Sequence, residues 1–165
     1  DFRRSRGLGD VYKRQGHVYK WSSKDGYSIV PNSQGTWPNG IDMIDDDLYV
    51  NYRGNGKITK FSSNMRKDLI LRTYLNGGPD NVTAVGDELW IGGQNTDLGG
   101  LNCIPEDVIQ CSMPFFIIRA DRDLNILEEY NFKDVAYGGA SVAYPFEDKI
   151  FIGAYKSDRI AIFKR

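Results

Sequence analysis

Residues 38–41 (Pro-Asn-Gly-Ile), followed by residues 48–50 (Leu-Tyr-Val), decide the fold because the same pattern returns further along the chain. The second copy is residues 79–82 (Pro-Asp-Asn-Val), followed by residues 89–91 (Leu-Trp-Ile). In both copies the polar residue after Pro precedes the Leu by nine residues, and the copies are 41 residues apart. A period of this length is typical of β-propeller blades, each of which is a small antiparallel sheet packed around a common axis.

A third copy is present in residues 138–142 (Gly-Gly-Ala-Ser-Val), where Ser141 precedes Ile150 by nine residues. The step from Asp80 to Ser141 is 61 residues, and it shortens to about 41 once an insertion over residues 93–114 is discounted. The sequence therefore predicts an all-β fold, a partial β-propeller of about three and a half four-stranded antiparallel blades.

The strands are predicted from short stretches rich in Val, Ile, Tyr and Phe that lie between Gly, Pro, Asn and Asp. Helix signals are almost absent. We expect two outer strands at 17–21 and 27–30, a complete blade at 41–44, 48–52, 57–61 and 68–74, an interrupted blade at 82–85, 89–92, 115–120 and 126–130, and three final strands at 142–144, 149–153 and 159–163.

The N-terminal segment differs from the rest of the chain. Residues 5–15 (Ser-Arg-Gly-Leu-Gly-Asp-Val-Tyr-Lys-Arg-Gln) resemble the in-frame translation of a sequencing adapter, although a basic N-terminal arm is the alternative. We therefore set residues 1–15 aside as not native and expect residues 16–165 to be a propeller domain whose N-terminal blades are missing. The last blade has three predicted strands, so its fourth strand is expected from that missing N-terminal half.

Charge and hydropathy argue against nucleic-acid binding and against a membrane-spanning helix. Without the five basic and two acidic residues of 1–15, the chain has 16 basic and 20 acidic residues, a formal charge of −4 instead of −1. Such a balance does not suggest nucleic-acid binding. No apolar run approaches the ~20 residues of a membrane-spanning helix, so no membrane span is expected.

Three polar side chains occupy equivalent places in the repeat. Equivalent positions of successive blades meet near the axis of a propeller, and Asn39, Asp80 and Asn81 carry oxygen atoms there. An Asn or Asp in an isolated turn usually caps backbone groups. The shared repeat position instead favours oxygen ligands that converge on one ion or one substrate.

These turns, together with residues 153–163 (Gly-Ala-Tyr-Lys-Ser-Asp-Arg-Ile-Ala-Ile-Phe), resemble the calcium-dependent six-bladed propellers of the gluconolactonase, senescence-marker-protein and paraoxonase (arylesterase) superfamily. The resemblance covers residues 16–165. It implies an axial calcium held by Asn39, Asp80 and Asn81, with a Glu and a further Asn in blades that this sequence lacks. It also implies hydrolysis of a small lactone or ester, with Asp80 as metal ligand, as the base that activates water, or both.

The resemblance does not decide whether the protein is an enzyme, because the remaining metal ligands and any catalytic His would lie upstream of this sequence. We expect residues 16–165 to be inactive on their own. The alternative is a non-catalytic binding or sensor propeller of the NHL or strictosidine-synthase-like kind, in which the same turns are structural. Fold alone does not choose between the two.

Two further features have simpler interpretations. Asp45–Asp47 and Asp121–Asp123 are interpreted as solvated hairpin turns and not as metal clusters. Cys103 and Cys111 lie in the insertion, and a local disulfide between them would indicate a periplasmic or secreted protein. Two unpaired thiols in a cytoplasmic protein are the alternative.

Overall fold

The computed structural model describes residues 15–62, 65–70, 77–95, 112–133 and 135–165. Within these ranges the chain consists of strands, turns and one short 3-10 helix, η1 (Arg53–Asn55). The expected all-β fold is confirmed. In the same ranges no helix is long and apolar enough to cross a membrane.

Three antiparallel sheets form the body of the molecule, and in each of them the strands follow one another in chain order. We call them the first, second and third sheets. The first contains β5 (Pro38–Ile44), β6 (Asp47–Tyr52), β7 (Lys57–Ser62) and β8 (Met65–Ile70), the second contains β9 (Gly77–Val85), β10 (Glu88–Asn95), β11 (Phe115–Asp121) and β12 (Ile126–Phe132), and the third contains β13 (Ala140–Phe146), β14 (Lys149–Ala154) and β15 (Ala161–Lys164).

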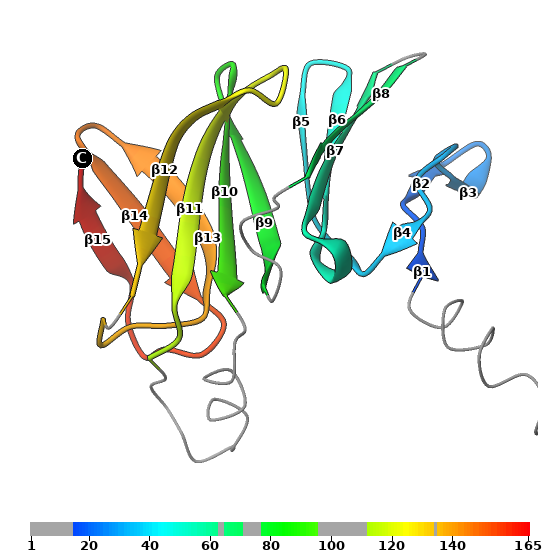
Figure 1. Ribbon diagram of the computed structural model, residues 1–165. Coiled ribbons are helices and arrows are strands. Elements are labelled where there is room, and N and C mark those ends of the chain that lie inside the picture. Colours follow the sequence, from blue (N-terminus) through cyan, green and yellow to red (C-terminus); the bar gives the residue numbers. More distant parts are fainter. Residues whose placement is uncertain (1–14, 63–64, 71–76, 96–111, 134) are drawn as a thin grey trace, which may run out of the picture.

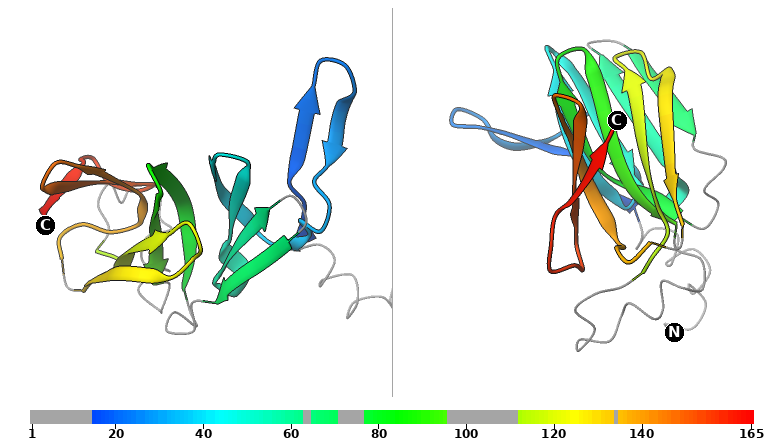
Figure 2. Two further views of the ribbon diagram at one scale, coloured as in Figure 1. Left: turned by 90° about the horizontal axis from the view of Figure 1, so that it is seen from above. Right: turned by 90° about the vertical axis from the view of Figure 1, so that its left-hand side faces the viewer.

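Two smaller strand pairs precede the first sheet. β2 (Tyr19–Ser22) and β3 (Gly26–Ile29) form the predicted hairpin. Figure 2 shows this hairpin standing away from the three sheets. The second pair, β1 (Gln15–Gly16) with β4 (Gly35–Thr36), was not predicted. It includes Gln15, the last residue of the segment set aside, whereas residues 1–14 lie outside the described ranges.

Several predicted strand bounds are wrong. The fourth strand of the first sheet is Met65–Ile70 and not 68–74, because Ser62 already pairs with Met65 across a short connection; residues 71–76 lie outside the described ranges. β10 does not stop at residue 92, since Gly93 and Gln94 pair with Pro79 and Gly78 of β9. The last strand begins at Ala161 and not at residue 159.

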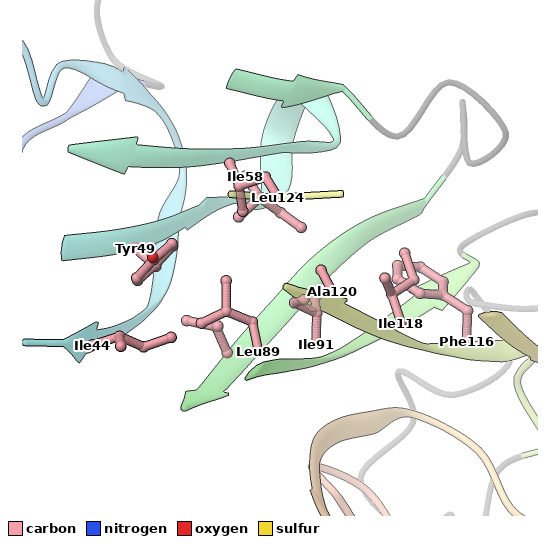
Figure 3. Close-up of a cluster of buried hydrophobic side chains, with 10 residues drawn as sticks. Ile44, Tyr49, Ile58, Leu89, Ile91, Phe116, Ile118, Ala120 and Leu124 are labelled. Carbon is pink, nitrogen blue, oxygen red and sulfur yellow. The ribbon is translucent and has the colours of Figure 1, made fainter. Parts of the chain in front are cut away.

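The sheets stand in a row, with the second between the other two (Figure 1). One apolar cluster fills the space between the first and second sheets. Figure 3 shows Ile44, Tyr49 and Ile58 on one side of it and Leu89 and Ile91 on the other. A second cluster joins Trp90, Phe115 and Ile117 of the second sheet to Ala143, Ile150 and Ile152 of the third. Burial of these side chains holds the row together.

A β-bulge recurs in β5, β9 and β13, the strands that begin the three sheets. Pro38 lies opposite Tyr52 and Ile41 lies opposite Val50, so β5 has one residue more than β6 over this interval. The same extra residue occurs between Pro79 and Val82 of β9 and between Ala140 and Val142 of β13. A bulge redirects the side chains next to it. The repeated polar residue, Asn39, Asp80 or Ser141, falls inside this bulge in each sheet.

Candidate functional site

Asn39 and Asp80 meet where the bulges of β5 and β9 lie side by side. Nδ2 of Asn39 donates a hydrogen bond to Oδ1 of Asp80 at 2.7 Å. The two residues are 41 positions apart and are therefore equivalents in the repeat. The structure thus brings together two of the three predicted ligands, from different sheets.

Gly40 allows this close approach. A Cβ atom at Gly40 would lie 2.4 Å from the carbonyl oxygen of Asp80 and 2.5 Å from Cα of Asn81. Backbone atoms at such distances cannot give way as a flexible side chain can. Asn81, the third predicted ligand, is half-buried in the bulge, and its backbone packs against Gly40.

Gln94 holds the second oxygen of the Asp80 carboxylate. Its Nε2 atom donates to Oδ2 of Asp80 at 2.7 Å and to the carbonyl oxygen of Ala140 at 2.6 Å. Gln94 is fully buried. It therefore connects the bulge of β9 with the beginning of β13, and the site spans the second and third sheets as well as the first.

Arg53 supplies a positive charge beside the carboxylate. Its Nη1 atom lies 3.7 Å from Oδ2 of Asp80 and donates a hydrogen bond to Oε1 of Gln94. Arg53 and Gln94 are also 41 residues apart, so they form a second pair of repeat equivalents in contact. The side chains of Asp80 and Arg53 are 14% and 24% exposed. The two charged groups are therefore largely shielded and offset one another, whereas Asn39 is exposed.

Sequence reasoning missed Arg53 and Gln94, although the repeat period contained the signal. Counting 41 residues from Arg53 leads to Gln94, just as counting 41 from Asn39 leads to Asp80. Gln94 falls in the predicted insertion over residues 93–114. In the structure Gly92, Gly93 and Gln94 all belong to β10.

Asn51 supports the backbone of the same bulge. Its Nδ2 atom donates to the carbonyl oxygen of Asp80 at 3.1 Å, and its side chain is fully buried. Oδ1 of Asn51 has no hydrogen-bond partner within the described residues. A buried amide oxygen without a donor costs free energy, about 1–3 kcal/mol, unless a cation or a water satisfies it.

The third copy of the repeat does not extend the cluster with a carboxylate or an amide. Ser141 directs its hydroxyl to the carbonyl oxygen of Gly153 in its own sheet, at 3.5 Å. Gly92, the repeat equivalent of Asn51, packs against this bulge, and a Cβ atom there would lie 3.1 Å from the carbonyl carbon and oxygen of Ser141. The backbone arrangement is repeated, but the polar chemistry is concentrated on Asn39 and Asp80.

The oxygen atoms of the cluster are of the types that bind calcium. Calcium binds carboxylate, amide and backbone oxygens, and here the carboxylate of Asp80 lies beside Asn39, while the amide nitrogen of Asn51 contacts the backbone carbonyl oxygen of Asp80. Asn39 presents its nitrogen to Asp80, and a half-turn of the carboxamide would present its oxygen instead. Among the described residues no three His, Cys, Asp or Glu side chains gather into a metal-binding group. The predicted ligand set has a single carboxylate, so it does not depend on such a group.

The two acidic turns contribute to sheet packing and not to this cluster. Nζ of Lys60 lies 2.9 Å from Asp47 and 3.0 Å from Asp123, and so links the first sheet to the turn between β11 and β12. Arg122 of that turn lies 3.0 Å from Asp45 and 3.1 Å from Asp87. These contacts agree with the interpretation of both acidic stretches as turns, and they show that the turns also connect two sheets.

Ionisation in this ion-pair network follows from its contacts. Hydrogen bonds from Ser62 and Lys60 hold the pKa of Asp47 below its ordinary value. Burial by itself would lower the pKa of Lys60, but its hydrogen bonds to Asp47 and Asp123 outweigh burial and raise the pKa of the amine. Both groups are therefore charged near neutral pH.

The chain matches no protein-family model and no curated protein. Cys103 and Cys111, with most of the predicted insertion, lie outside the described residues. The conclusions about the site therefore rest on the geometry of Asn39, Asp80, Gln94, Arg53 and Asn51.

Proposed function

We propose that the three sheets are successive blades of a β-propeller and that the cluster around Asp80 is its axial site. In this interpretation β5, β9 and β13 are the innermost strands. Three observations support it: the strands follow one another in chain order in each sheet, each first strand has a bulge at the same repeat position, and repeat equivalents contact one another. Radial repetition of a sheet is the arrangement that brings equivalent side chains together.

We further propose that the axial site binds calcium and that the protein with all its blades is a calcium-dependent hydrolase of a small lactone or ester. The observation that carries this proposal is the 2.7 Å contact between Asn39 and Asp80, two oxygen-bearing side chains from successive sheets. Asn39, Asp80 and Asn81 would hold the ion. Calcium takes 6 to 8 oxygen ligands, so further ligands would come from other blades.

The proposed mechanism centres on the carboxylate of Asp80. Bound calcium would polarise the carbonyl of the substrate and stabilise the oxyanion that forms. Gln94 donates to Oδ2 of Asp80 and orients its carboxylate, and Oδ1 accepts a hydrogen bond from Asn39 until the Asn39 carboxamide turns its oxygen to the ion. Each of these oxygens retains a second lone pair, through which Asp80 can accept a proton from the attacking water.

A second candidate function is a non-catalytic binding or sensor propeller. Both oxygens of Asp80 already accept hydrogen bonds within the chain, and Arg53 partly balances its charge. A polar cluster that only stabilises the packing of neighbouring sheets would have these same contacts. In that case Asp80 would matter for stability and not for a reaction.

Hydrolysis of small lactones and aryl esters by the protein with all its blades, measured with calcium and with a chelator, separates the two functions. We expect activity that needs calcium and that falls at least 100-fold in Asp80→Ala, the size of effect typical of a lost acid–base or oxyanion-stabilising group. Asp46→Ala is the matched control, because Asp46 is an exposed carboxylate in the turn after β5. Unchanged activity in Asp80→Ala would reject the hydrolase mechanism, whereas a folded but inactive wild type would favour the binding module.

A further inference from the structure

Two Asn-Gly pairs of the chain, Asn39-Gly40 and Asn55-Gly56, lie wholly within the described ranges, and the structure places them in different surroundings. An Asn followed by Gly is chemically labile, because Gly has no side chain to shield its backbone nitrogen and this nitrogen can attack the side-chain amide of the Asn. The attack needs a rotation of the Asn backbone. Local structure therefore determines at which pair it occurs.

The first pair is held in place, although the side chain of Asn39 is exposed. Its Nδ2 atom donates to Oδ1 of Asp80 at 2.7 Å, and Gly40 is buried against the backbone of Asp80 and Asn81. Asn39 and Gly40 belong to β5, which pairs with β6 on both sides of the bulge. A rotation at Asn39 would have to separate the first sheet from the second.

The second pair lies in the short connection between β6 and β7. Asn55 is the last residue of η1, it is exposed, and its side chain makes no hydrogen bond within the described residues. Gly56 has a φ of +62°, and its backbone nitrogen lies 3.4 Å from the carbonyl oxygen of Arg53, which is long for a hydrogen bond. A three-residue 3-10 helix is weakly held, so little opposes rotation at Asn55.

We propose that Asn55 is a site of spontaneous deamidation. The backbone nitrogen of Gly56 forms a bond to Cγ of Asn55, and the side-chain nitrogen leaves with the Gly56 amide proton as ammonia. The product is a five-membered succinimide. Water then opens either carbonyl of this ring and leaves aspartate or isoaspartate at position 55. Water is the only co-reactant, and the inference does not depend on calcium or on catalysis.

Conversion of Asn55 changes the charge beside the cluster around Asp80. The new carboxylate lies two residues from Arg53, whose guanidinium contacts Asp80 and Gln94, and it competes for the same positive charge. Isoaspartate also adds a methylene group to the backbone of a closely packed connection, since a Cβ atom at Gly78 would lie 2.3 Å from the carbonyl oxygen of Arg53. We therefore expect conversion to weaken the contact of Arg53 with the cluster and to lower the stability of the protein.

Peptide mapping of the full chain after incubation at mildly alkaline pH tests the proposal. The chymotryptic peptide 53–61 contains Asn55 as its sole asparagine, so a mass gain of about 1 Da in this peptide measures the conversion. In the folded chain Asn55 should convert about 10-fold faster than Asn39 or more, because a turn opens more readily than a paired strand. In urea, where both backbones are free, the two rates should be similar.

Three results would overturn the proposal: no conversion of Asn55 in the folded chain, equal rates at Asn55 and Asn39 in the folded chain, or the same difference in urea. The last of these would mean that the sequence around each pair, and not the structure, sets the rates.

Asn55→Gln is the matched variant for the effect on stability. Its amide is retained, but attack by the backbone nitrogen would need a six-membered ring, so conversion should be much slower. Fresh wild type and fresh variant should unfold at the same urea concentration, whereas the incubated wild type should unfold at a lower concentration than the incubated variant. Equal midpoints after Asn55 has converted would refute the effect on the cluster.

Discussion

At the scale of single residues, the site depends on a glycine that contributes no polar atom. Gly40 lets the bulge of β5 approach the backbone of Asp80 and Asn81, and this approach brings Asn39 within hydrogen-bonding distance of Asp80. Gly in the Asn-Gly pair was expected to serve a turn. In the structure it lies in a strand and is needed for close contact between two sheets.

Substitution of Gly40 should therefore be costly. Gly40→Ala places a methyl group against backbone atoms 2.4–2.7 Å away, and we expect a loss of about 3 kcal/mol in the free energy of unfolding. Gly26→Ala is the control, because its φ of +67° is unfavourable for Ala but no atom lies within 4 Å. That control should cost about 1–2 kcal/mol, the penalty of left-handed backbone alone. Urea unfolding measures both, and an equal loss in the two variants would contradict the packing role of Gly40.

Residue-scale prediction from the sequence succeeded where a repeat could be counted. Asn39 and Asp80 were predicted to converge because they share a repeat position, and they are in contact. Arg53 and Gln94 have the same spacing of 41 residues, but they were missed because they lie outside the repeated motif. Asn51 was missed because its role depends on the backbone of Asp80, 29 residues away, and such a contact has no sequence pattern.

At the scale of elements, short apolar stretches between Gly, Pro, Asn and Asp located the strands but not their ends. The apolar stretches in β6, β7, β10, β11 and β14 identify strands because their side chains pack between sheets. The ends depend on pairing partners instead. β10 continues through Gly93 because β9 begins at Gly77, and neither glycine carries a hydrophobic signal.

Ion pairs at the turns add a pH-dependent link between the first and second sheets. The pKa of Asp47 is lower in the folded protein than its ordinary value of about 3.9, so the folded state binds fewer protons than the unfolded state. The contribution of Asp47 to stability is therefore present above about pH 4 and is lost as the pH falls through the lower, folded pKa.

Asp47→Asn should reduce this acid sensitivity. We expect a loss of about 1 kcal/mol in the free energy of unfolding at pH 7, because the Lys60 pair is partly exposed, and a shallower decrease between about pH 5 and pH 2. Asp46→Asn, in the same turn but absent from the salt bridges of the described residues, should retain the steeper decrease. Denaturant unfolding over this pH range provides the test, and parallel curves for Asp47→Asn and the wild type would count against the link.

At the scale of the whole molecule, the candidate site exists only because separate sheets stack in register. Asn39 comes from the first sheet, Asp80 and Gln94 from the second, and the carbonyl oxygen of Ala140 from the third. The period of 41 residues predicted this stacking, since equal repeats that pack in the same way place equivalent residues side by side. The extent to which each sheet is covered required the structure, because exposure differs between residues that occupy the same place in the repeat, such as Ile41 at 51% and Val82 at 5%.

Equilibrium calcium binding by the protein with all its blades, measured by titration calorimetry, tests the central claim that the contact between Asn39 and Asp80 marks an axial calcium site. The account predicts one saturable site in the wild type, binding at least 10-fold weaker in Asp80→Asn, which keeps the shape of the side chain but removes its charge, and unchanged binding in Asp46→Asn. Absence of binding in the wild type, or equal affinity in Asp80→Asn, would contradict the account.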